Sequence, residues 1–359
     1  MGKVHTIQAC VQKMLLVMLV VLVSHQAWSA VEKRKLIIDS DPGIDDALAL
    51  TLALQYPGFD IIGITTTFGH ADIEQASQNA LRIVELSGQP IPVYKGAGKP
   101  LVVVADAPTD LVHGQDGLGN THQPIPTGQV ESKPAAQFLV DIAREFPGEI
   151  TLVALGRLTN LAQAIRQDPN FAKNIQQVVL AGGALHIPGN VSPVAEANIA
   201  GDPHAADIVF TAPWQVSMVG LDVSTKVRVG DKMLTRIKAR NQRFGEFVYA
   251  TTRYYAGIYP QQQSKGGFYV YAPSAMVYLI EPELFKIQQG PVRVVTEGIA
   301  IGQTIMAAGD NQTVLSPWKG QPMVTAAVDI DKARFEKYLE TLLLGEWPLV
   351  SDLKRSKTK

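Results

Sequence analysis

The sequence contains one cysteine, no surplus of charge of either sign, and only one long apolar run. Of its 359 residues, 32 are Lys or Arg and 33 are Asp or Glu, so the formal net charge is −1. A chain without a basic surplus lacks the charge that would neutralise a phosphate backbone, which argues against nucleic acid as a partner. The 30 Gly and 22 Pro are spread along the chain, and 46% of the residues are hydrophobic. This composition is typical of a globular enzyme and excludes disordered or collagen-like chains.

The long apolar run lies near the start of the sequence. Two lysines precede the apolar residues 14–23, and small residues follow at positions 27, 29 and 30. This order predicts a signal peptide over residues 1–29, cleaved after Ser29, and therefore a secreted or periplasmic protein. An uncleaved membrane anchor is the alternative, although the run is shorter than the roughly 20 residues that span a bilayer. No later segment is apolar enough to span one, so we expect no membrane contact after cleavage. Cys10 lies within the predicted signal, so the mature chain would hold neither a disulfide nor a thiol nucleophile.

Beyond residue 35 the sequence alternates between short apolar runs and helical patterns. The predicted strands are 36–38, 61–66, 150–155, 178–180 and 216–223, and the predicted helices are 47–54, 71–86, 161–165 and 203–210. Continuous apolar strands separated by helices predict an α/β fold with a Rossmann-like open, mostly parallel sheet covered on both faces. Such sheets bind ligands at the carboxyl ends of their strands. Because no linker or internal repeat is present, residues 30–359 are predicted to form a single domain.

Four acidic residues follow the first predicted strand. Residues 39–46 read DSDPGIDD, which places four carboxylates at a strand–turn–helix junction. Helix capping would explain Asp45 or Asp46 taken singly, but four crowded carboxylates repel one another unless a cation or shared protons compensate. Calcium and magnesium bind such oxygen ligands. Gly43 permits a tight turn that brings Asp41 and Asp46 together.

Two enzyme classes begin with an acidic loop of this kind. A phosphatase with an aspartyl nucleophile would show Asp-x-Asp followed by Thr or Val, whereas here Pro42 and Gly43 follow. The loop instead resembles the signature of the inosine–uridine type nucleoside hydrolases, and this resemblance extends along most of the mature chain. Its further motifs occur in the order of that family: 63–66 (GITT), 113–117 (HGQDG), 155–162 (LGRLTNLA), 181–184 (AGGA), 189–190 (GN), 195–198 (AEAN) and 202–203 (DP).

The resemblance implies a hydrolase that cleaves the N-glycosidic bond of ribonucleosides with a calcium-bound water. It implies that Asp41 binds the metal and takes a proton from the water, that Asp46 is a second ligand, and that Thr159 offers a backbone carbonyl. It further implies a set of substrate contacts. The ribose hydroxyls would be held by Asp45, Asn190, Glu196 and Asn198, and His113 would lie beside the base. For Asn190 and Asn198, capping of a loop is the alternative role.

The sequence also departs from this family. By position, Tyr271 stands in place of a His that helps the base to leave, and Ala272 in place of an Asp that binds calcium. A methyl group cannot bind a metal, so calcium would be held weakly. Tyr271 is either a neutral proton donor or an aromatic side chain that fills the pocket. His70 stands where the family usually has Asn after Gly, and Ala197 where it usually has an aromatic residue.

Two functions therefore remain open at this stage. One is a calcium-dependent nucleoside hydrolase, and the other is a non-catalytic ribonucleoside-binding protein that has lost an intact calcium site. The tyrosines 254, 255 and 259 recur at helical spacing, which is more typical of core packing than of a base pocket. A homo-oligomer is compatible with either function.

Overall fold

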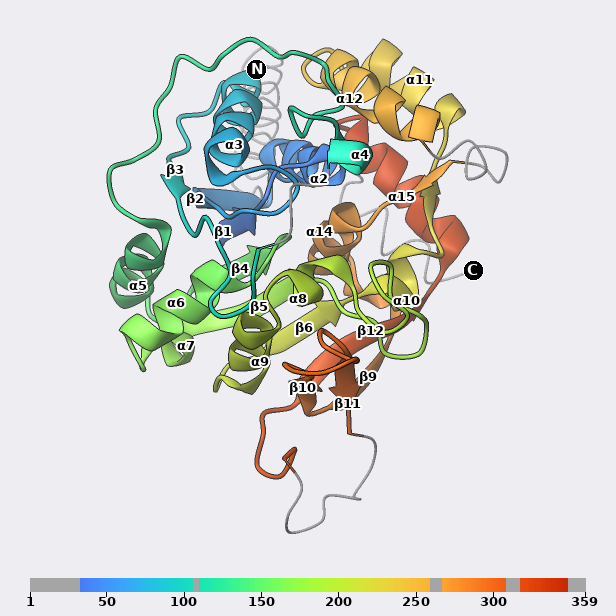
Figure 1. The fold of residues 1–359 in the computed structure, drawn as a ribbon. Coiled ribbons are helices and arrows are strands. Elements are labelled where there is room, and N and C mark those ends of the chain that lie inside the picture. The colour runs from blue at the N-terminus through green and yellow to red at the C-terminus, as the bar shows by residue number, and fades with distance from the viewer. Residues whose placement is uncertain (1–32, 106–109, 259–266, 308–316, 348–359) are drawn as a thin grey trace, which may run out of the picture.

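The computed structural model describes residues 33–105, 110–258, 267–307 and 317–347. The predicted signal peptide, with Cys10, and Tyr259 lie outside these ranges. An eight-stranded sheet has the order β3-β2-β1-β4-β5-β6-β12-β9 (Figure 1). Its strands are β1 (Arg34–Ser40), β2 (Phe59–Thr66), β3 (Val93–Lys95), β4 (Ile150–Ala154), β5 (Ile175–Ala181), β6 (Val216–Val219), β9 (Phe285–Gly290) and β12 (Val324–Ile330).

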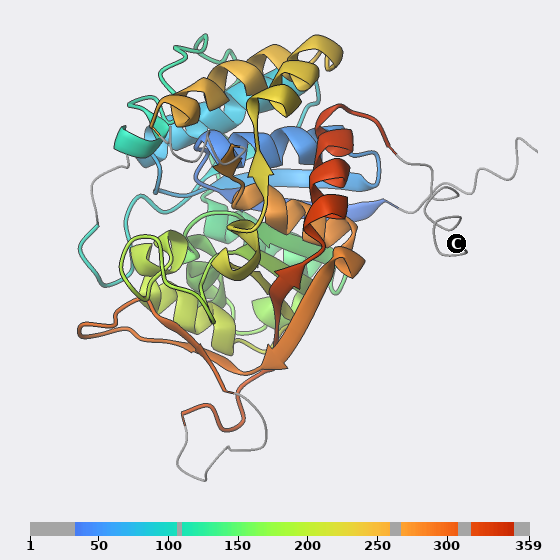
Figure 2. The same cartoon turned by 90° about the vertical axis from the view of Figure 1, so that its right-hand side faces the viewer.

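The sheet is mostly parallel, as the sequence predicts. Every neighbouring pair is parallel except β12 and β9, which pair antiparallel at one edge. Figure 2 shows these two strands side by side, in red and orange. Two small antiparallel pairs lie outside the sheet: β7 (Arg228–Val229) with β8 (Phe268–Tyr269), and β10 (Val292–Val294) with β11 (Thr304–Met306).

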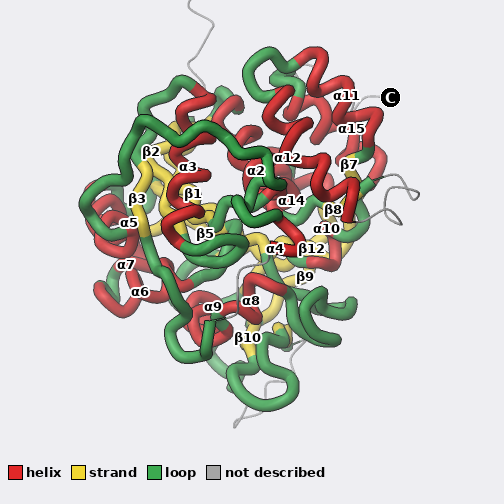
Figure 3. The backbone as a smooth tube through the Cα atoms, turned by 45° about the horizontal axis from the view of Figure 1, so that its top comes forward, coloured by secondary structure: helices red, strands yellow, loops and turns green. Residues whose placement is uncertain are grey.

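Helices cover both faces of the sheet (Figures 1 and 3). One side carries α2 (Ile44–Gln55), α3 (Ile73–Ser87), α11 (Asp231–Arg240), α12 (Gly245–Ile258), α14 (Ala272–Ile280), the 3-10 turn η1 (Pro282–Leu284) and α15 (Lys332–Leu343). The other side carries α5 (Ala135–Glu145), α6 (Thr159–Gln167), α7 (Phe171–Asn174) and α9 (Pro203–Thr211). The short helices are α4 (Asp110–His113), α8 (Ala197–Gly201) and α10 (Leu221–Ser224). Within the described ranges, no helix is both long and apolar enough to cross a membrane.

The strands feed two separate cores because successive side chains point to opposite faces. In β1, Leu36 and Ile38 pack into the core beneath α2 and α14, whereas Ile37 packs into the core beneath α5 and α6. All three side chains are fully buried. This explains why β1 is apolar without alternation, as expected for a strand that is covered on both faces.

One predicted strand is too long. The sequence predicts a strand over 216–223, but β6 ends at Val219 and α10 begins at Leu221. At Gly220 the backbone passes so close to the segment after β5 that a Cβ atom would lie 2.3 Å from the Gly183 carbonyl oxygen. The Leu221 amide then donates to that same oxygen at 2.9 Å. The apolar run continues, but this contact turns the chain into a helix beside the cavity described below.

Candidate active site and metal centre

A cavity opens at the carboxyl ends of the parallel strands, where the fold predicts a ligand site. Its wall includes the residues that follow β1, β2, β4, β5 and β6, together with residues of α12 and the start of α14. It brings together most of the predicted site residues, which are far apart in the sequence. These are Asp41, Asp45, His113, Asn190, Glu196, Asn198 and Tyr271. Ala272 lines the same cavity, as its position in the sequence predicts.

The acidic loop is almost completely buried. Asp41, Asp45 and Asp46 are 1%, 4% and 0% exposed. Asp45 and Asp46 lie in the first turn of α2, where the helix dipole favours negative charge. Burial raises the pKa values of Asp41 and Asp45, and the neighbouring carboxylates raise them further. The cluster therefore requires a positive charge in order to stay fully ionised.

A hydrogen-bond network beneath the cavity fixes the first acid. The Asn160 amide nitrogen donates to Asp39 Oδ1 at 2.7 Å and to the Thr66 carbonyl at 2.8 Å, and its oxygen accepts the Ala97 amide at 2.8 Å. The Thr65 hydroxyl also donates to Asp39 Oδ1, at 2.5 Å. Burial raises the pKa of Asp39 to about 7, although both donors favour its charged form. Asp39 is thus a structural acid, tied to the end of β2 directly and, through Asn160 of α6, to the segment that follows β3.

Two buried carboxylate oxygens favour a cation at this site. Asp41 Oδ1 and Asp46 Oδ2 accept no hydrogen bond from the described residues, and neither does Oδ2 of the structural acid Asp39. The remaining oxygens of these side chains are satisfied: Asp41 Oδ2 accepts the His70 amide at 3.1 Å, and Asp46 Oδ1 accepts the Ser40 hydroxyl at 2.7 Å. A buried polar atom without a partner is costly, so an oxygen of this kind in each of two adjacent acids is the arrangement that a metal ion would satisfy. The acids and His70 could together hold a metal.

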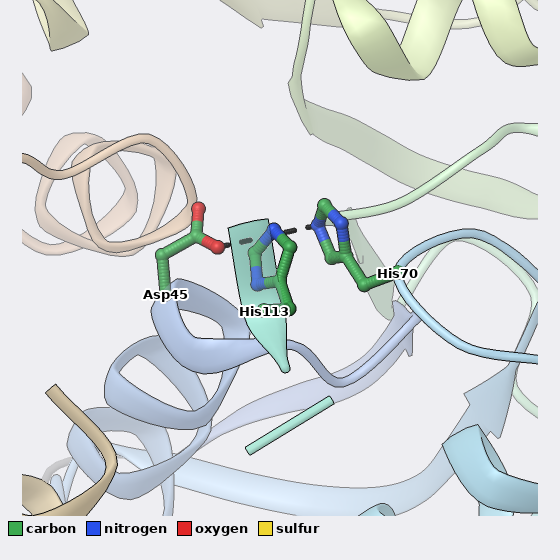
Figure 4. Close-up of side chains that lie close together, drawn as sticks. All are labelled: Asp45, His70 and His113. Carbon is green, nitrogen blue, oxygen red and sulfur yellow. Dashed lines mark ion pairs between the residues drawn. The ribbon is translucent and has the colours of Figure 1, made fainter. Parts of the chain in front are cut away.

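His70 points into the acidic cluster. Its Nε2 lies 3.4 Å from Asp46 Oδ2, 3.9 Å from Asp41 Oδ2 and 4.0 Å from Asp45 Oδ1. Burial disfavours the charged imidazolium, but the three carboxylates outweigh this effect and raise the pKa of His70 to about 10. Figure 4 shows its ring beside that of His113, with the Asp45 carboxylate turned toward them; the ring centroids are 3.7 Å apart.

His113 is held as a neutral imidazole. Its Nδ1 accepts the Ile44 amide at 3.1 Å, which assigns the ring proton to Nε2. Burial and the nearby His70 both lower its pKa well below the usual value. The Tyr255 hydroxyl lies 3.2 Å from His113 Nδ1 and 3.3 Å from Asp45 Oδ1. Tyr255 therefore links the acidic loop to the predicted base side of the cavity.

The residues predicted to hold ribose also organise the loops around them. Glu196 Oε2 caps α8 by accepting the amides of Asn198 and Ile199, and burial raises its pKa. The Asn198 amide donates to the carbonyls of Leu155 and Ala181 at 2.7 and 2.9 Å. Asn190 Oδ1 accepts the Ala197 amide at 3.0 Å. The alternative capping role is thus present in the structure, while their contact with ribose stays a prediction.

The predicted role of Thr159 also stays a prediction. Its side chain is buried at the start of α6, and its hydroxyl donates to Asp202 Oδ2 at 2.8 Å. Among the described residues of this loop, Leu155 and Arg157 line the cavity and Thr159 does not.

Sequence reasoning undervalued two residues that line the cavity. Tyr255 is a cavity residue as well as a core residue, which its helical spacing alone could not reveal. Arg157 is 7% exposed, and its guanidinium stacks 4.6 Å above the Phe68 ring. The positive charge of Arg157 therefore lies near Asp41. In the sequence, Arg157 lies within the 155–162 motif, and this position could have identified it as a site residue.

Comparisons with known proteins agree on one family. The sequence profile described as "Inosine-uridine preferring nucleoside hydrolase" matches residues 36–337. The chain is 39% identical to a probable uridine nucleosidase of Oryza sativa subsp. japonica, over 88% of this chain and 98% of that protein. It is 36% identical to an inosine-uridine preferring nucleoside hydrolase of Leishmania major, over 76% and 87%. A solved plant nucleoside hydrolase superposes with a TM-score of 0.83 at 39% identity, covering 87% of this chain and 99% of that one.

We predict that Asn160→Ala destabilises the protein without direct loss of a substrate contact. The change removes three hydrogen bonds and leaves buried groups unsatisfied at about 1–3 kcal/mol each, so the free energy of unfolding should fall by at least about 3 kcal/mol. Urea denaturation of Asn160→Ala beside Asn190→Ala tests this, because Asn190 lies in an exposed loop. Equal stability of the two variants would contradict the structural role given to Asn160.

Proposed function

This chain belongs to the inosine–uridine preferring nucleoside hydrolase family and is an enzyme that hydrolyses ribonucleosides. We propose that the reaction takes place in the cavity beside β1, with Asp41 as the proton acceptor. The observation that carries the proposal is the pair of buried oxygens without a hydrogen bond, Asp41 Oδ1 and Asp46 Oδ2. Asp41 lines the cavity, and Asp46 lies buried behind it. The rival function, a binding protein without turnover, is not favoured because the relatives are named as nucleosidases and hydrolases.

Asp41 and Asp46 would hold the divalent cation, with Thr159 as the predicted carbonyl ligand. Carboxylate and carbonyl oxygens bind calcium and magnesium, and the family resemblance favours calcium. When bound, such a cation supplies a Lewis acid that lowers the pKa of water and stabilises negative charge. Ala272 contributes no ligand atom, so this set of oxygen ligands holds calcium weakly.

The remaining residues would position the nucleoside and move the protons. Asp41 accepts a proton from water as the oxygen bonds to the anomeric carbon and the bond from that carbon to the base breaks. Asp45, Asn190, Glu196 and Asn198 orient the ribose hydroxyls and favour the positive charge that develops on the sugar. The base leaves toward His113 and Tyr271. The Tyr271 hydroxyl can donate a proton to the departing base.

The first test replaces the proton acceptor. Asp41→Asn keeps the shape of the side chain but cannot accept the proton, so kcat for uridine and inosine should fall by about 10²–10⁴-fold, the usual contribution of a general base. The assay is release of reducing sugar from a nucleoside panel, with the exposed Asp60→Asn as the matched control. Turnover equal to that of the wild type would remove the assignment. A large loss of thermal stability without ligand would instead indicate a structural role.

The second test restores an acid at position 272. Ala272 is 1% exposed, and its amide donates to Asp45 Oδ2 at 3.3 Å, so a carboxylate at this position would join the cluster. Ala272→Asp should raise the calcium association constant by about tenfold or more, and tenfold equals about 1.4 kcal/mol. Calorimetric titration measures it. Ala272→Asn, which has nearly the same volume but no charge, is the matched control. Unchanged calcium affinity in a folded Ala272→Asp variant would mean that position 272 does not face the cation.

We also propose that the protein is exported and acts as residues 30–359. The apolar run and the small residues that follow it support this proposal. N-terminal sequencing of the mature protein from a periplasmic or secreted fraction should begin at Ala30. A soluble cytosolic protein that retains Met1 or Gly2 would contradict the proposal.

A further inference from the structure

The distance between His70 and Asp46 is that of two ligands that share one ion, and Asp41 lies slightly farther from His70. Nε2 lies 3.4 and 3.9 Å from carboxylate oxygens of Asp46 and Asp41. Asp41, Asp46 and His70 each offer one ligand atom, and these three atoms lie within 4.8 Å of one another. A direct charge-assisted hydrogen bond would be about 2.7–2.9 Å. Ligands bound at about 2.0–2.2 Å to a tetrahedral ion lie about 3.4 Å apart.

The unpartnered oxygens select two of the three acids. Asp41 and Asp46 each keep one buried oxygen without a hydrogen bond from the described residues. Asp45 differs, because its two oxygens accept from the Tyr255 hydroxyl and the Ala272 amide at 3.3 Å each. For Asp46 the oxygen nearest to His70 and the oxygen without a hydrogen bond are the same atom, Oδ2. For Asp41 they are the two oxygens of one carboxylate, Oδ2 and Oδ1. Both observations therefore point to the side chains of Asp41, Asp46 and His70.

The imidazole is held in place from two directions. Its ring packs on His113 at 3.7 Å with an interplanar angle of 31°, and the His70 amide donates to Asp41 Oδ2. Gly43 makes room for both rings, since a Cβ atom there would lie 2.6 Å from His70 Cδ2 and 2.5 Å from His113 Nδ1. A ring enclosed in this way presents Nε2 to the acids without having to be ordered first.

We infer that His70 Nε2 is a protein ligand of the cation, together with Asp41 and Asp46, and that this nitrogen shifts the metal preference of the site away from calcium toward a divalent ion such as Zn²⁺. The inference extends the metal role proposed above to the identity of the ion. Calcium takes six to eight oxygen ligands, whereas imidazole suits zinc and other transition metals. Ala272 cannot supply the oxygen that would favour calcium, while His70 supplies a nitrogen from another strand end.

The test changes only the ligand atom. His70→Gln replaces an imidazole nitrogen by an amide oxygen of similar reach, and His186→Gln makes the same exchange at an exposed His outside the cavity. Calorimetric titration of the untagged, chelator-treated mature protein with Zn²⁺ and with Ca²⁺ gives the ratio of the two association constants. This ratio should fall by about tenfold or more in His70→Gln, since even outer-shell partners change metal affinity about 10–100-fold. It should be unchanged in His186→Gln.

A second readout identifies the donor directly. Co²⁺, titrated as a spectroscopic probe for Zn²⁺, should develop a visible absorption spectrum in the wild type that changes in His70→Gln and is retained in His186→Gln. A ratio that does not change in folded His70→Gln would overturn the inference. So would a wild type that binds neither ion while His70→Gln gains binding, because His70 would then occupy the place of the cation. If the ratio shifts but no nucleoside is hydrolysed with any of these ions, the proposed function fails and the ligand assignment stands.

Discussion

The buried carboxylates at the end of β1 carry negative charge that must be compensated, and the rest of the site is arranged around this requirement. Asp41, Asp45 and Asp46 lie within six residues of one another and are almost inaccessible to water. Separately, each could be satisfied by the first turn of α2 or by hydrogen bonds, but together they repel one another. Burial raises the pKa values of Asp41 and Asp45, and the neighbouring carboxylates raise them further. A proton on His70 and a divalent cation are two ways to compensate the same charge. The cation carries twice the charge and can contact several oxygens at once.

The backbone around Asp41 explains how so many polar groups fit into so little space. A Cβ atom at position 69 would lie 1.6 Å from Asp41 Oδ2, so only glycine lets the segment after β2 pass over this carboxylate. Below it, Asn160 joins the ends of β1 and β2 to the segment that follows β3 through hydrogen bonds that do not depend on the metal. This network is separate from the candidate metal ligands, so the fold can keep its loops in register while those ligands vary.

The sequence predicts those parts of the fold that depend on local pattern. The apolar runs of β1, β2, β4 and β5 and the acidic start of α2 are all found, and only their ends differ from the prediction. The strand over 216–223 is too long because the turn at Gly220 arises from a contact with Gly183, beyond the end of β5, which no local pattern encodes. Tyr255 was assigned to the core for a similar reason: helical spacing shows which face is buried, but not that its hydroxyl reaches Asp45 and His113. The family resemblance identified His70 as a departure, and only the three-dimensional arrangement shows that its ring points toward the acids.

The two positions near the acids at which the chain departs from the family, 70 and 272, line one cavity and can be explained together. Ala272 lies at the start of α14 and His70 in the loop after β2, about 200 residues apart in the sequence, yet both line the wall that contains Asp41 and Asp45. A carboxylate at 272 in addition to an imidazole at 70 would crowd one ion, and losing both would leave Asp41 and Asp46 with too few protein ligands. A methyl group at 272 together with an imidazole at 70 keeps the number of possible ligands and exchanges an oxygen for a nitrogen. Because the ligands come from separate strand ends, this exchange requires no change in the sheet, and the chemistry of the cation can change while the fold and the predicted ribose contacts remain.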